Sequence, residues 1–249
     1  MRTKNPGVIA ITSFALLIVL GTTYHAMAQD AAKPYPSMAP IEQYLMDRTA
    51  EIALARSAAP ESISRDATIL VLERQGYETA VNGNNGFVCW VGRSWMGMFD
   101  WPEFWNPKVR AADCMNLQAA HSLLPIIYLR SRMVMAGRSK AEIVSALKAA
   151  YEKKQLPELE SGAMDYMMSK SAYLTDAGGH NLPHLMFFTA GMNAKDWGSG
   201  AAGSPIMSAP YWFFSSQEPS QMKGLPSILV FLVPVADWSD GTPAGKHND

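Results

Sequence analysis

Short segments with two different hydrophobic periods alternate along the chain, and turn residues separate them. Apolar residues recur at the three- and four-residue spacing of a helix over residues 40–56, 117–135 and 140–154. Segments rich in β-branched and aromatic residues, typical of strands, are 67–72, 77–81, 87–91, 163–169, 184–189, 210–214 and 227–233. Strands, then helices, then strands predict an α+β fold. We expect an antiparallel sheet, made of an N-terminal meander plus C-terminal strands, packed with a central group of helices.

Turn and capping residues set the ends of these segments. The stretch 82–86 (Asn-Gly-Asn-Asn-Gly) predicts a hairpin turn between the second and third strands, because Asn and Gly tolerate positive φ. Ser139 and Glu142 have the spacing of a capping box, which predicts a helix that starts directly after the serine. Pro125 is expected to split the helical segment 117–135 into two pieces.

The first 28 residues have the three parts of an export signal peptide. Arg2 and Lys4 form a basic start, Val8–Leu20 is an uncharged apolar run, and 26–28 (Ala-Met-Ala) supplies small residues before a cleavage point. The apolar run is shorter than the ~20 residues that a membrane-spanning helix needs, so we expect removal rather than anchoring. The prediction is a periplasmic or secreted protein without a stable membrane anchor after cleavage.

The rest of the chain divides by composition into three parts. Residues 29–39 are rich in Pro and Ala and predict a flexible lead-in. Residues 40–239 carry all the periodic segments and predict a single α+β domain. Residues 240–249 predict a disordered tail.

The charge balance argues against a nucleic-acid partner. The chain has 21 basic and 22 acidic side chains, and the signal peptide carries two of the basic ones, so the mature chain is mildly acidic. Lys and Arg do not concentrate in any stretch, and such a concentration is the usual electrostatic footprint of a nucleic-acid binder. We therefore expect no nucleic acid as partner. The aromatic segment described below favours a small molecule or a peptide instead.

Cys89 and Cys114 are the only two cysteines. In an oxidising compartment, two cysteines in the mature chain predict one disulfide bond. The alternative is a pair of free buried thiols.

The segment 94–113 is aromatic and interrupted by prolines, and we expect it to be irregular. It holds Trp95, Trp101 and Trp105, and Arg93 comes directly before it. Aromatic side chains beside a polar group are typical of small-molecule sites, so these four residues are candidate ligand-binding residues. The alternative is that the tryptophans form a small core under a long loop.

His180 and His184 are the most suggestive candidates for a metal site. The glycines before the first histidine and the proline between the two exclude a helix, so both would lie on a loop that enters a strand. Together with Asp176, or with Asp165, they would supply the two imidazoles and one carboxylate that hold a transition metal ion. The alternative is that they are hydrogen-bonded loop residues without a metal. A transition metal ion at this site is the one cofactor that the sequence suggests.

Five segments carry a resemblance to other sequences: 51–60, 76–88, 104–107 (Phe-Trp-Asn-Pro), 164–169 and 183–188. They resemble an uncharacterised group of exported bacterial proteins, and the likeness covers most of the mature chain. The resemblance implies one exported bacterial domain. It carries over no activity, cofactor or site residue.

Three functional hypotheses follow. The first is an exported binding protein that holds a small molecule or peptide in an aromatic-lined cleft. The second is a metal-dependent enzyme, hydrolytic in type, that uses His180 and His184. The third is a structural or stress-related envelope protein.

Overall fold

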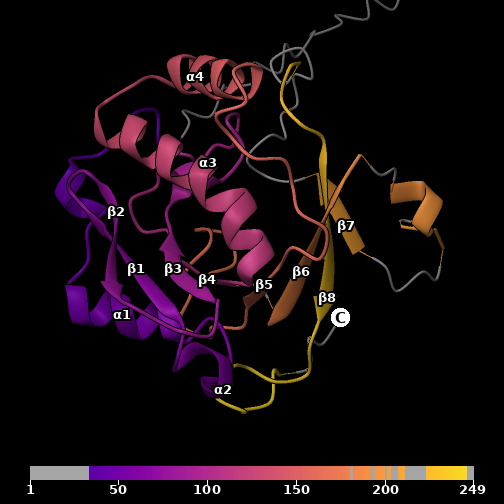
Figure 1. Cartoon of the computed structure of the whole chain (residues 1–249). Coiled ribbons are helices and arrows are strands. Elements are labelled where there is room, and N and C mark those ends of the chain that lie inside the picture. Colours follow the sequence, from indigo (N-terminus) through magenta and orange to yellow (C-terminus); the bar gives the residue numbers. More distant parts are fainter. Residues whose placement is uncertain are drawn as a thin grey trace, which may run out of the picture. The chain divides into compact units, whose positions relative to one another are not determined.

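The computed structural model describes residues 34–179, 182–191, 194–199, 201–202, 207–210 and 223–245. In these ranges an eight-stranded sheet is packed with helices, which confirms the predicted α+β class (Figure 1). The strand order is β2-β1-β3-β4-β5-β6-β8-β7, and every neighbouring pair except one is antiparallel. The predicted signal peptide, residues 1–28, lies outside the described residues.

The strands are β1 (Thr68–Glu73), β2 (Gly76–Val81), β3 (Val88–Gly92), β4 (Ala111–Met115), β5 (Met164–Met167), β6 (His184–Ala190), β7 (Met207–Pro210) and β8 (Ile228–Pro234). The helices are α1 (Arg48–Arg56), α2 (Glu61–Ser64), α3 (Leu117–Met135) and α4 (Lys140–Glu152). Short 3₁₀ helices are η1 (Ile41–Gln43), η2 (Ser94–Met96) and η3 (Ala194–Trp197). β4 lies at the end of the segment that was expected to be irregular. Of the predicted strand 210–214, only residue 210 is described.

The first three strands differ from the predicted meander in their order. β1 lies between β2 and β3 and runs parallel to β3, so 82–86 is a crossing connection and not a hairpin turn. Gly83 packs directly on the start of β1, where an added Cβ would lie 2.2 Å from the backbone nitrogen of Thr68. The Gly83 N–H donates to the Thr68 side chain, and Asn84 N–H donates to the Asp66 carbonyl. The glycine is needed for close backbone approach.

For the helices, the capping-box prediction is confirmed and the predicted break at Pro125 is wrong. The capping box of Ser139 and Glu142 is present at the start of α4, as predicted. α3 continues through Pro125, so the predicted split is wrong. Pro125 removes the hydrogen bond to the carbonyl of His121, an exposed position where water can satisfy that carbonyl. Burial of the residues around the proline, such as Leu123 and Ile127, holds the helix in place.

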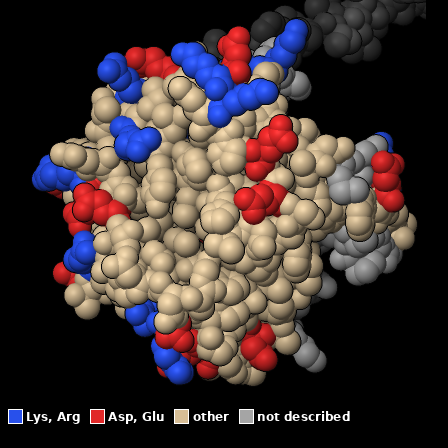
Figure 2. Space-filling view, viewed as in Figure 1, with Lys and Arg blue, Asp and Glu red and all other residues tan. Residues whose placement is uncertain are grey.

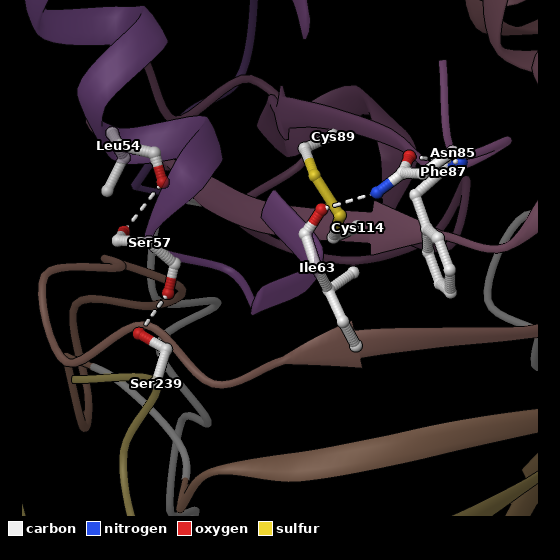
Figure 3. The surroundings of a disulfide bond; sticks show 8 residues. All are labelled: Leu54, Ser57, Ile63, Asn85, Phe87, Cys89, Cys114 and Ser239. Carbon is white, nitrogen blue, oxygen red and sulfur yellow. Dashed lines mark hydrogen bonds between the residues drawn. A yellow bond between two sulfur atoms is a disulfide. The ribbon is translucent and has the colours of Figure 1, made fainter. Parts of the chain in front are cut away.

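The two faces of the sheet carry different cores. α3 lies over one face of the sheet (Figure 1). On that face, residues of α3 and α4 form a large apolar cluster with β-strand residues and the aromatic segment. On the other face, α1 covers a smaller cluster that contains Cys89 and Cys114, both fully buried. These cysteines are direct neighbours on β3 and β4 and form a disulfide bond, which confirms that prediction (Figure 3).

The ends of the predicted domain are hydrogen-bonded to its body where they are described. In the lead-in, the Tyr35 hydroxyl donates to Asp176, and the Ala39 N–H donates to the Tyr44 hydroxyl. Beyond β8, Ser239 donates its hydroxyl to the Ser57 carbonyl at the end of α1 (Figure 3). Of the predicted tail, residues 240–245 are described. No helix within the described ranges has the length and apolar character that crossing a membrane requires.

Candidate functional site

Two aspartates lie side by side on the α3 face of the sheet. Side chains alternate along a strand, so Asp113 shares its face with Met115 on β4. In the register between β4 and β5, Met115 is opposite Asp165, which places Asp165 diagonally across from Asp113 on the same face. The two carboxyl groups share a hydrogen bond. Two acidic side chains on neighbouring buried strands thus form one unit.

Both carboxyl groups are withdrawn from water, and this changes their protonation. Asp113 is 7% exposed and Asp165 is 1% exposed. Burial raises the pKa of Asp113, and burial together with the nearby Asp113 charge raises the pKa of Asp165 well above its usual range. Because a charge on one carboxylate disfavours ionisation of the other, the pair loses its two protons in separate steps. After the first step the pair holds one proton between its two carboxyl groups and carries one negative charge.

A cavity of about 310 Å³ opens above this pair. Its walls come from β3, β4, β5 and β6, from the segment after η2, and from residues 174–175. The walls are mainly aromatic, aliphatic and thioether groups; the aromatic and sulfur-bearing members are Trp90, Trp101, Met96, Met98, Met115 and Met186. The volume is at the small end of the ~300–1,000 Å³ that is usual for ligand cavities. An apolar enclosure with a few polar groups is the usual form of a small-molecule site.

Two polar atoms of cavity-lining residues have no hydrogen-bond partner in the described part of the chain. They are Oδ1 of Asp165 and Nε1 of Trp90, and both are buried. A buried polar atom without a partner costs about 1–3 kcal/mol. A ligand with hydrogen-bonding groups would reduce that cost, so these atoms favour a binding role for the cavity.

Arg93 lines the cavity as well, but its guanidinium group is already engaged. Its Nη2 atom lies 2.9 Å from Oε1 of Glu51, and both side chains are almost completely buried. The remaining nitrogens donate to the carbonyls of Tyr44 and Val91. The positive charge of Arg93 is therefore balanced by Glu51 and fixed by main-chain acceptors. It shapes the wall of the cavity without being free for a ligand anion.

The predicted tryptophan set divides into two groups. Trp101 lines the cavity together with Arg93. Trp95 is fully buried, donates its Nε1–H to the Ser131 hydroxyl, and packs against Tyr44. Trp105 is also in the core, with its ring edge-on to Phe104. The structure thus places two of the four predicted ligand-binding residues at the cavity and two in the core beneath the aromatic segment.

The predicted metal ligands have separate surroundings where they are described. His180 lies outside the described residues. Asp176 accepts hydrogen bonds from Lys108, Tyr35 and Tyr173, and these contacts lower its carboxyl pKa, the Lys108 contact most. Asp176 thereby links the lead-in segment, the aromatic segment and residues 173–176 at the surface.

His184 lies on β6 and is buried. Its Nδ1–H donates to the Leu182 carbonyl at 2.7 Å, and burial lowers its pKa, so the neutral imidazole is favoured. In the described ranges, no three His, Cys, Asp or Glu side chains are close enough together to hold a metal ion.

Asp113 is the site residue that sequence reasoning missed. A signal for it exists, because it is the only acid in the otherwise apolar run 111–115 (Ala-Ala-Asp-Cys-Met). The run was not recognised as a strand, since the aromatic segment before it is irregular. Asp165 was recognised only as an alternative metal ligand, and its pairing with Asp113 could not be read from the sequence.

Charged side chains at the surface are mixed. Figure 2 shows acidic and basic groups interspersed near the rim of one face, with a broad uncharged area between them.

No protein-family model, no curated protein and no solved structure matches this chain. The functional argument therefore rests on the geometry of the cavity.

Proposed function

We propose that this protein binds a small, largely apolar molecule in the cavity above Asp113 and Asp165. The observation that carries the proposal is the combination of an apolar cavity of about 310 Å³ with a buried pair of carboxyl groups at its base. A pocket of apolar walls with a few convergent polar groups and perturbed pKa values is the usual form of a ligand site. The polar pair would fix the orientation of a ligand whose body contacts the tryptophan and methionine walls.

The surrounding structure supports a preformed site. The β-strands that carry the two aspartates are central in the sheet, and their neighbours on both sides are paired. The Arg93–Glu51 ion pair and the Thr175 hydroxyl, which donates to Glu103, fix two further parts of the wall. A rigid site loses little conformational entropy when a ligand binds, and this favours affinity for a small molecule.

The test is a titration of the full chain with 2-phenylethanol, a neutral apolar probe, followed by tryptophan emission. Trp90 and Trp101 line the cavity, so occupancy should change the emission in a saturable way. For a probe of this size we expect a Kd of about 1 mM or tighter. Ala111→Leu places a larger side chain in the cavity wall and should weaken binding about tenfold or more.

The matched control is Ala141→Leu, the same change at an exposed position of α4. It should bind the probe as the unaltered protein does. Equal binding by Ala111→Leu, or no saturable change with the unaltered protein, would overturn the proposed function. Circular dichroism of both variants shows whether the fold is retained.

A further inference from the structure

We propose, on the basis of the proposed function, that the ligand is an organic cation, a small ammonium compound whose charged end meets the carboxyl pair. Among the lining residues that the structure describes, the ionisable side chains are those of Arg93, Asp113 and Asp165. Arg93 is balanced by Glu51 at 2.9 Å. Of the described lining residues, none other than Arg93 could place a cation beside the carboxyl pair.

The negative charge of the carboxyl pair is present in the folded protein before a cation binds. When the pair holds one proton, it carries one negative charge in a site where water is largely excluded, as its 1% and 7% exposed side chains show. Folding has already removed these carboxyl groups from water, so a ligand cation does not have to desolvate them again. Oδ1 of Asp165 also has no hydrogen-bond partner in the described chain, and an ammonium N–H could supply one.

The walls are compatible with the same ligand class. The faces of Trp90 and Trp101 can attract an organic cation through their π electrons, and the four methionine sulfurs around them are polarisable. An anion would meet the carboxyl charge, and the described wall offers no unbalanced cation to offset it. A neutral alcohol would gain a hydrogen bond but no charge interaction. The cavity therefore favours a cation over a neutral compound, and a neutral compound over an anion.

The experiment compares three probes of similar shape on the unaltered protein at pH 8, above the pKa of about 7 to which burial raises Asp113: 2-phenylethylammonium, 2-phenylethanol and phenylacetate. We expect the ammonium compound to bind about tenfold or more tightly than the alcohol, and phenylacetate to bind weakest. Asp113→Asn should reduce the advantage of the ammonium probe to about threefold or less. Asp66→Asn removes an exposed carboxylate elsewhere and should leave the full advantage in place.

The outcomes separate this inference from the proposed function. Equal or tighter binding of the alcohol, with all binding weakened by Ala111→Leu, would overturn the charge preference and leave the cavity as a ligand site. Failure of all three probes to saturate the unaltered protein would overturn both. The three-probe comparison uses only the unaltered protein, so it tests the preference for a cation even if Asp113→Asn does not fold. Retention of the tenfold advantage in a folded Asp113→Asn variant would also refute the assigned role of the carboxyl pair.

Discussion

Replacing Asp165 by Asn should make the protein less sensitive to pH between pH 5 and pH 7. In the unfolded chain both aspartates ionise near pH 4. In the folded protein, burial and the mutual repulsion of the two groups raise the pKa of Asp165 well above that value. Above pH 4 the folded state thus binds more protons than the unfolded state, and stability falls as the pH rises. Asn retains a side-chain donor for the Asp113 carboxylate but cannot titrate.

The magnitude follows from the number of protons retained. One proton held by the folded state and not by the unfolded state changes the free energy of unfolding by about −1.4 kcal/mol per pH unit. From pH 5 to pH 7 the difference in stability between Asp165→Asn and the unaltered protein should therefore shift by about 3 kcal/mol in favour of the variant. His184 acts in the opposite direction, because burial lowers its pKa, but it is present in both proteins and cancels in the difference.

The assay is urea unfolding at pH 5, 6 and 7 with the disulfide intact, followed by tryptophan emission. Asp66→Asn, at an exposed position, is the matched control and should show the pH dependence of the unaltered protein. A difference between Asp165→Asn and the unaltered protein that stays constant from pH 5 to pH 7 would refute the reasoning. It would mean that Asp165 is ionised over this whole range in the folded protein.

Two further predictions concern the frame around the cavity. Gly83→Ala should lower the free energy of unfolding in urea by roughly 3 kcal/mol or more, since its Cβ would lie 2.2 Å from β1 backbone atoms. The control Gly162→Ala has open space around its Cβ and should lower it by about 1 kcal/mol because of its positive φ alone. Equal losses of stability in the two variants would contradict the need for close approach at Gly83. Replacing both Cys89 and Cys114 by Ala removes a disulfide bond between residues 25 positions apart. This double variant should have a free energy of unfolding about 3.5 kcal/mol lower than that of the unaltered protein. An equally stable double variant would contradict it.

Local sequence signals were sufficient to predict several elements of the structure. The capping box of Ser139 and Glu142 fixes the start of α4, because both hydrogen bonds form within one turn. The strand segments near residues 67–91 were recognised by composition. The disulfide followed from the number of cysteines and the expected compartment, and the structure places both cysteines opposite each other on neighbouring strands.

Other features depended on contacts between distant segments. The order of β1, β2 and β3 differs from a meander because the connection at Gly83 passes over the start of β1, and hairpin statistics for Asn and Gly do not contain that contact. α3 continues through Pro125 because its neighbours are buried in the large core, which outweighs the lost hydrogen bond. The sequence pattern predicts Trp95 and Trp105 as binding residues, but both are buried in the large core.

The sequence by itself determined the α+β class, most strand segments, one helix cap and the pair of cysteines, because these depend on periodicity, turn chemistry and composition within short windows. Only the tertiary structure decided that Asp113 and Asp165 meet. They are far apart in the chain, and their contact depends on the register of β4 against β5, in which Met115 is opposite Asp165. A shift of one residue would turn one aspartate to the other face, and no local pattern specifies that register.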